Sequence, residues 1–285
     1  MLLSEMNPGQ EVYIPMRTGT DEEGNAIWTD TAFMVMQQGK PNGSYDDSFL
    51  GGTVLMQSGK AAYYQKQLVV NYNQTGKKCD YASTCAHRQY LASGGAFEQS
   101  LDPEVALQVL TVRIPYRAGT DGSTVKYDLE AKYWLPSAAE VAISGGDDAD
   151  EQEESPFYVQ EGARFDYFAD KNPMDYADWL ATDSGGRQGF WFTRTPAESI
   201  GSIGFYALDE LGRAYPYDSG EYAGRVCMVL PGKARVGESG HLHFGGNLPM
   251  KQDGVWKDTS AFCKVDGVWR EVSCVGMKVG GVWKT

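Results

Sequence analysis

Histidine, cysteine and long apolar runs are scarce in this chain of 285 residues. It has three histidines and five cysteines. An odd cysteine number at irregular spacing argues against the disulfide framework of small secreted domains. No run approaches 18 apolar residues, and the N-terminus lacks the basic segment and apolar core of a signal peptide. These absences predict folding in a reducing cytoplasm, without membrane insertion.

Basic residues are also few, with 25 Lys and Arg against 38 acids and a formal net charge of -13. Nucleic acid is therefore not an expected partner, because its phosphates would be repelled. The charge is uneven, since the segment 249–285 has six basic residues against four acids. The acid run at 147–154 lacks the internal glycine of a calcium loop and is predicted to be a solvated loop.

The chain ends in a threefold repeat. Its copies are MKQDGVWK at 250–257, CKVDGVWR at 263–270 and MKVGGVWK at 277–284. Two-residue Asp-Gly or Gly-Gly turns between short strands predict hairpins, and this register sets a lysine opposite a tryptophan in each. Short repeats cannot each hold a core, so they must stack on one another or on a partner. We predict an assembly role, with a ligand-binding module of the cell-wall type as the alternative, for three pairs: Lys251 and Trp256, Lys264 and Trp269, Lys278 and Trp283.

Short strands with two or three helices precede the repeats, which predicts an α+β domain over residues 1–235 and a glycine-rich linker at 236–248. Ser83 is expected to cap a short helix, and Asp102 to start a second one with proline at its first position. Ser137 and Glu140 have the spacing of a capping box. Strands are predicted at 11–15, 31–36, 52–57, 132–135, 190–194, 205–208 and 226–230.

Four segments in one order suggest a known family. They are YAS at 81–83 with RQYL at 88–91, KYWLPSAAEV at 132–141, GFWFTRTP at 189–196, and GRAY at 212–215 leading into GRVCMVLP at 224–231. Over roughly residues 9–235 the chain resembles the DUF6273 family of gut bacteria and their phages. The usual Arg-Pro pair before the last strand is replaced here by Arg225-Val226.

The resemblance implies a C-type-lectin-like fold. The family is similar in this respect to formylglycine-generating enzymes and to the variable receptor-binding proteins of diversity-generating retroelements. The terminal repeats resemble segments at the ends of phage tail and fibre proteins. Resemblance of fold does not by itself imply an activity.

Aromatic and arginine residues are frequent between residues 187 and 225, the part of the chain that the resemblance implies is the exposed binding face. Tyrosine, tryptophan and arginine are the residues that anchor interfaces. Trp191 lies between two phenylalanines and is predicted to pack inside. The predicted receptor-binding residues are Arg187, Arg213, Tyr215, Tyr217 and Tyr222.

No catalytic residue, metal or cofactor is predicted. Cys227 lies in an apolar strand and is expected in the core. The formylglycine-generating enzymes need a reactive cysteine pair, and no matching pair occurs here. Cys79, Cys85 and His87 lack the second close ligand pair of a zinc site, and the two histidines of the predicted linker are expected to be solvated.

The sequence thus predicts a non-catalytic phage or phage-like virion protein, at a tail fibre or tail tip, that binds a protein or glycan receptor on a bacterial surface. It is expected to form a homo-oligomer whose repeats contact other virion proteins. It would fold in the host cytoplasm and leave by lysis. Two alternatives stay open: a structural decoration or fibre-assembly subunit with the lectin-like domain as scaffold, and an enzyme related to formylglycine-generating proteins.

Overall fold

The strands of the computed structural model fall into two units along the chain, Met1–Leu242 and His243–Thr285. The division lies inside the segment 236–248 that the sequence predicts as a linker. The first unit is mainly β-sheet with a few short helices. The structure describes residues 1–41, 45–58, 80–119, 125–143, 161–171, 181–182, 188–189, 191–199, 202–208, 214–217, 223–244, 247–252, 255–260, 262–265, 268–271, 277–279 and 282–284.

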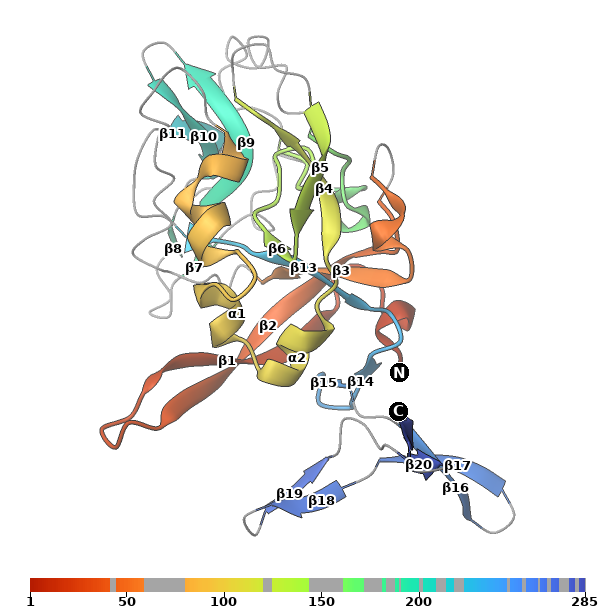
Figure 1. Ribbon diagram of the computed structural model, residues 1–285. Coiled ribbons are helices and arrows are strands. Elements are labelled where there is room, and N and C mark those ends of the chain that lie inside the picture. Colours follow the sequence, from red (N-terminus) through yellow and green to blue (C-terminus); the bar gives the residue numbers. More distant parts are fainter. Residues whose placement is uncertain are drawn as a thin grey trace. The chain divides into compact units, whose positions relative to one another are not determined.

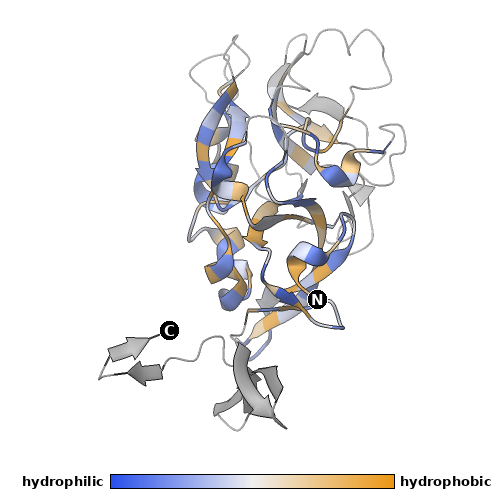
Figure 2. Cartoon of the chain, turned by 90° about the vertical axis from the view of Figure 1, so that its right-hand side faces the viewer, coloured by the Kyte–Doolittle hydropathy of each residue, from blue (hydrophilic) through white to orange (hydrophobic). Residues whose placement is uncertain are grey.

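A five-stranded antiparallel sheet in the order β1-β2-β3-β13-β6 forms the centre of the first unit (Figure 1). Of its three inner strands, β2, β3 and β13, the last two are buried on both faces, in keeping with their largely apolar sequences. Apolar residues, in orange, lie on both the strands and the short helices of the first unit (Figure 2). The bounds are β1 Glu11–Thr20, β2 Ala26–Gln38, β3 Gly52–Gln57, β6 Tyr133–Trp134 and β13 Cys227–Pro231.

A second sheet has the order β11-β10-β9-β12, with β12 parallel to β9 and the other pairs antiparallel. β4 and β5 form a separate hairpin, as do β7 and β8, and β14 pairs with β15. The bounds are β4 Val112–Arg117, β5 Val125–Ala131, β7 Ala181–Thr182, β8 Gln188–Gly189, β9 Trp191–Ser199, β10 Ser202–Leu208, β11 Ala214–Tyr217, β12 Ala223–Gly224, β14 Arg235–Val236 and β15 Leu242–His243.

The helices are short. Asp102 caps α2, Pro103–Gln108, by accepting hydrogen bonds from the Glu104 and Val105 amides, as predicted. α1, Ala96–Ser100, was not predicted.

The predicted cap at Ser83 is wrong. The Asp80 carboxylate accepts from the Ala82 amide and the Ser83 hydroxyl, and this holds residues 81–83 in a 3₁₀ turn. Thr84 instead accepts from the His87 amide at the start of a π-helical turn over Ala86–Tyr90. The Ser83 hydroxyl is thus used as a donor to Asp80, and Thr84 accepts from the backbone in its place.

The β1–β2 ribbon extends beyond the sheet as an arm (Figure 1). Val12, Ile14 and Met16 alternate inward in the sheet. From Arg17 to Asp30, every residue is exposed except the half-buried Gly19. We call residues 17–30 the arm.

Both ends of the first unit lie together. The Leu3 amide donates to the Ala234 carbonyl at 2.7 Å, and the Met1 amino group donates to the Val236 carbonyl at 3.1 Å. Leu2 and Arg235 form an antiparallel bridge. The first unit therefore begins and ends at one edge.

The second unit contains three antiparallel hairpins. Each repeat forms one hairpin, and each lysine is opposite the tryptophan expected from the two-residue turn: Lys251 and Trp256, Lys264 and Trp269, Lys278 and Trp283. The bounds are β16 Asn247–Gln252, β17 Val255–Ser260, β18 Phe262–Val265, β19 Val268–Glu271, β20 Met277–Val279 and β21 Val282–Lys284.

Candidate functional site

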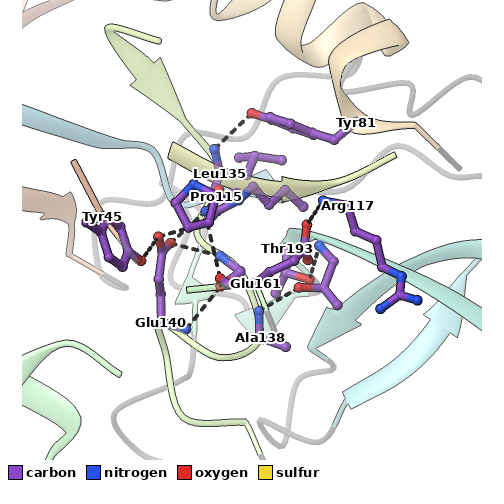
Figure 3. Close-up of polar contacts among 12 residues, drawn as sticks. Tyr45, Tyr81, Pro115, Arg117, Leu135, Ala138, Glu140, Glu161 and Thr193 are labelled. Atoms are coloured by element: carbon purple, nitrogen blue, oxygen red, sulfur yellow. Dashed lines mark hydrogen bonds and ion pairs between the residues drawn. The ribbon is translucent and has the colours of Figure 1, made fainter. Parts of the chain in front are cut away.

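A group of charged and polar side chains is buried around Arg194. Tyr45, Glu140 and Glu161 of this group are labelled in Figure 3. Arg194 lies on β9 between two buried threonines and has no exposed surface. Its Nη1 and Nη2 donate to the two carboxylate oxygens of Glu140 at 2.6 and 2.8 Å. Its remaining donors reach backbone carbonyls, at 3.0 Å to Pro115, 2.9 Å to Leu135 and 3.4 Å to Glu161. All five N–H groups are thus satisfied, as a buried guanidinium requires.

Glu140 is aimed at Arg194 by the predicted capping box, which is confirmed. The Ser137 amide donates to Glu140 Oε2 at 3.0 Å, and the Glu140 amide donates to Ser137 Oγ at 3.1 Å. The Tyr45 hydroxyl donates to Glu140 Oε1 at 2.5 Å. The box closes a single turn over residues 138–142 rather than a longer helix. Its function here is to hold a carboxylate inside the unit.

The charges of this cluster depend on one another. Burial opposes the charged form of Arg194, but the charge and hydrogen bonds of Glu140 outweigh it, so the pKa of Arg194 is above its usual value. Burial, followed by the Glu140 charge, raises the pKa of Tyr45 well above 10.0. The tyrosine therefore stays a neutral donor and Arg194 stays a cation.

Glu161 is a second buried carboxyl beside Arg194. Its Oε1 accepts from the Arg117 amide at 2.6 Å. Its Oε2 has no hydrogen-bond partner among the described residues. Burial raises the pKa of Glu161 to about 7, against the lowering effects of the Arg194 charge and of hydrogen bonds from Thr195 and Arg117. This carboxyl is thus half-protonated near neutral pH.

Arg225, a second fully buried arginine, lies where the central sheet approaches β9. Its guanidinium carbon is 5.3 Å from the centre of the Trp191 ring, and its Nε donates to the Gln57 carbonyl at 3.0 Å. The next amide, of Val226, donates to Gln57 Oε1 at 3.1 Å. A proline at position 226 could not make this bond, so the departure from the expected Arg-Pro pair is accommodated by Gln57.

This arrangement holds β9 to the β4 strand and to the turn that carries Glu140. Arg194, Glu140 and Glu161 have no exposed surface, and Tyr45 is 3% exposed. Charged groups sealed in this way are positioned by one another and cannot meet a dissolved substrate without opening the core.

Most of the expected receptor-binding residues lie outside the part of the chain that the structure describes. Arg187, Arg213 and Tyr222 fall outside the described residues. Tyr215 and Tyr217 are placed by their backbone alone, on β11 opposite Ala207 and Phe205 of β10. β11 is the first strand in the order of its sheet.

Trp191 and Cys227 are fully buried, as predicted. Burial raises the pKa of the Cys227 thiol well above 9.0, so it stays protonated and is a poor nucleophile.

Cys85 and His87 were not expected to bind a metal, and the described part of the chain contains no cluster of metal-ligating side chains. There, no group of three His, Cys, Asp or Glu side chains could hold an ion. Cys85 is half-buried, and burial lowers the pKa of His87. Cys79 and the acid run at 147–154 lie outside the described residues.

His241 is not the solvated linker residue that was expected. Its Nε2 lies 2.9 Å from an Asp30 carboxylate oxygen, and its ring lies 5.8 Å from that of Tyr13. The Tyr13 amide donates to the Gly240 carbonyl, which attaches this segment to β1. His243 is exposed.

The fold and the buried cluster thus define a β-rich domain whose core contains paired charged and polar residues. Residues 52–232 match the family model of a domain of unknown function, DUF6273. This is more than half of the chain, and the chain belongs to the DUF6273 family. No curated protein and no solved structure matches the chain.

The family match runs from the start of β3 to just after β13. Arg194, Glu140, Glu161 and Arg225 lie inside it. The arm and the three repeat hairpins lie outside it. In the described part of the chain, no helix combines the length and apolar character needed to cross a bilayer.

Proposed function

We propose that this protein is a non-catalytic component of a phage or phage-like virion, at a tail fibre or tail tip, whose first unit binds a receptor on a bacterial surface. The first unit would be a C-type-lectin-like domain, and the repeats would attach it to other virion proteins or to further copies of the chain.

The observation that carries the proposal is the sealed Arg194 cluster. Arg194 uses all its donors inside the protein and fixes β9 to the turn that carries Glu140. β9 is in the same sheet as β11, on which Tyr215 and Tyr217 lie. A rigid sheet that carries tyrosines on a terminal strand suits recognition, since anchoring side chains bind best when they are preorganised.

The test is binding of the purified full-length protein to cells of a panel of gut bacteria, measured by flow cytometry. The variant Tyr215→Ala/Tyr217→Ala/Tyr222→Ala should reduce binding at least about tenfold, as loss of interface anchors does. Tyr127→Ala is the matched control, because Tyr127 is 41% exposed on β5, which pairs with β4 and is not in the sheet of β11. Equal loss in both variants would contradict the assignment of the binding face.

The second candidate is a structural decoration or fibre-assembly subunit, favoured by the separate unit of three hairpins. It would be supported if no cell in the panel binds the protein although particles incorporate it. The deciding variant for the remaining enzyme hypothesis is Cys227→Ala, which would abolish any turnover that depended on that thiol.

A further inference from the structure

The arm is a two-stranded ribbon whose residues are exposed apart from the half-buried Gly19, and Asp30 at its base contacts His241 of the same unit. Isolated two-stranded ribbons are marginal in water, and a covered face would stabilise one. Ile27 and Trp28 are 45% and 44% exposed. Because neighbouring residues of a strand point to opposite faces, each face of the arm presents one large apolar side chain. Trp28 is opposite Arg17, and Ile27 is opposite Gly19. These are features of a segment that inserts into a partner.

The tip of the arm is an ordered acidic turn. Asp21 Oδ1 accepts from the Glu23 and Asn25 amides at 3.0 and 2.7 Å, and Oδ2 accepts from the Asn25 side chain at 3.0 Å. The hydrogen bonds from Asn25 lower the pKa of Asp21, which therefore stays ionised. The arm contains four acids, at 21, 22, 23 and 30, and one base, Arg17, so it carries a net charge of -3. A partner should therefore be basic.

The second unit of the chain has the complementary character. His243–Thr285 contains six Lys or Arg and four acids, which gives it a net charge of +2. Because the whole chain has a net charge of -13, the first unit carries -15. Residues opposite each other in an antiparallel pair share one face. Each hairpin therefore has a lysine and a tryptophan on one face, and the base that follows the tryptophan on the other. The second set pairs as Lys257 with Met250, Arg270 with Cys263, and Lys284 with Met277.

We propose that the lysine–tryptophan faces of the repeats bind the arm of a second copy of this chain. The proposal rests on the assembly role given to the repeats in the proposed function. Contacts between two arms, or between two repeat units, would join like charges, whereas an arm and a repeat unit attract each other. Both elements lie outside the DUF6273 match, in keeping with a joint role.

An arm-to-repeat contact uses two different surfaces, so it joins copies head to tail. Such an interface closes into a ring or grows as a filament. Each copy then gives its repeats to one neighbour and its arm to another. This geometry separates the proposal from a symmetric dimer, in which both copies would use the same surface.

The experiment is sedimentation velocity of the full-length protein over a concentration series, at low and high salt. In the first variant, Lys251, Lys264 and Lys278 are all changed to Gln. In the matched control, Lys257, Arg270 and Lys284 are changed to Gln, which removes equal charge from the opposite faces. The first variant should weaken association by at least about tenfold, and the control by much less. Salt should also weaken association of the unmodified chain.

A mixing experiment shows which surfaces meet. Glu22→Lys/Glu23→Lys reverses the charge of the arm tip and leaves Asp21 to hold the turn. This variant alone, and the triple lysine variant alone, should stay monomeric. Mixed, they should form a one-to-one dimer and nothing larger, because one intact arm and one intact repeat unit remain. Circular dichroism melting of each variant checks that the first unit is folded.

The proposal is overturned if the unmodified chain is monomeric at tens of micromolar, if both triple variants weaken association equally, or if the mixture does not associate. It is also overturned if the first variant assembles normally but loses cell binding, which would make the repeats a glycan-binding module. Because cell binding is measured separately with the tyrosine variants, a failure of the receptor proposal would leave these outcomes unchanged.

Discussion

Replacing Glu140 with glutamine is expected to destabilise the first unit strongly, because it leaves the Arg194 charge buried without its paired carboxylate. The two charge-assisted bonds at 2.6 and 2.8 Å would become at most one neutral bond. Breaking a buried ion pair by neutralising one partner costs about 3–5 kcal/mol. The Tyr45 hydroxyl and the Ser137 amide still find an acceptor in the amide oxygen, so the loss comes mainly from the uncompensated charge.

The loss should depend on pH, because Glu161 can partly replace Glu140. Glu140 raises the pKa of Glu161, so its removal lowers that pKa below about 7 and favours a second anion beside Arg194. At pH 6 in the unmodified protein Glu161 is mostly protonated, whereas at pH 8 it is mostly ionised. The free energy lost by Glu140→Gln should therefore be larger at pH 6 than at pH 8.

Urea unfolding followed by tryptophan fluorescence at both pH values measures these differences. Glu130→Gln is the control, since Glu130 forms only an exposed ion pair with Arg113 and should cost less than about 1 kcal/mol. Arg194→Met combined with Glu140→Gln should cost less than the sum of the single changes, because the stranded charge is gone. If Glu140→Gln costs no more than Glu130→Gln, or the two changes simply add, the cluster does not stabilise the fold as argued.

Three further outcomes are expected. The pKa of Glu161 rises from 4.5 to about 7 on folding, so its contribution to stability is present below pH 4.5 and is lost as pH rises to 7. Glu161→Gln should therefore raise the unfolding free energy at pH 8 by up to about 3 kcal/mol, with little change at pH 5, in urea titrations. Gly162→Ala should lower the melting temperature more than Gly24→Ala; both glycines have positive φ, but only at Gly162 would the new methyl overlap the Tyr45 hydroxyl. Deleting residues 249–285 should leave the melting transition of the first unit intact while sedimentation shows loss of assembly.

The local chemistry of the site could be predicted from the sequence, but its long-range partners could not. The spacing of Ser137 and Glu140 indicates a capping box, and this box forms. Nothing local indicates that Glu140 also meets Arg194, 54 residues later. An arginine within an apolar strand is the one available signal, since a buried charge requires a partner.

The arm shows a different limit of sequence reading. Apolar alternation indicates β1 as far as Met16 and then stops, because no residue of the arm faces a core. The predicted strands therefore end where burial ends, although the ribbon continues to Thr20 and returns from Ala26. The Ser83 prediction failed because it rested on a residue type favoured at helix starts, whereas the Ser83 hydroxyl donates to Asp80 and the next residue, Thr84, accepts from the His87 amide.

The hydrogen bond between Leu3 and Ala234 has an evolutionary consequence. A unit whose entry and exit lie side by side can be inserted into a loop of an unrelated protein without stretching either chain. Recombination can therefore transfer such a unit as a cassette, because a single insertion point in the recipient protein is enough. Such cassettes could be exchanged between otherwise different proteins while the buried Arg194 cluster travels with them unchanged.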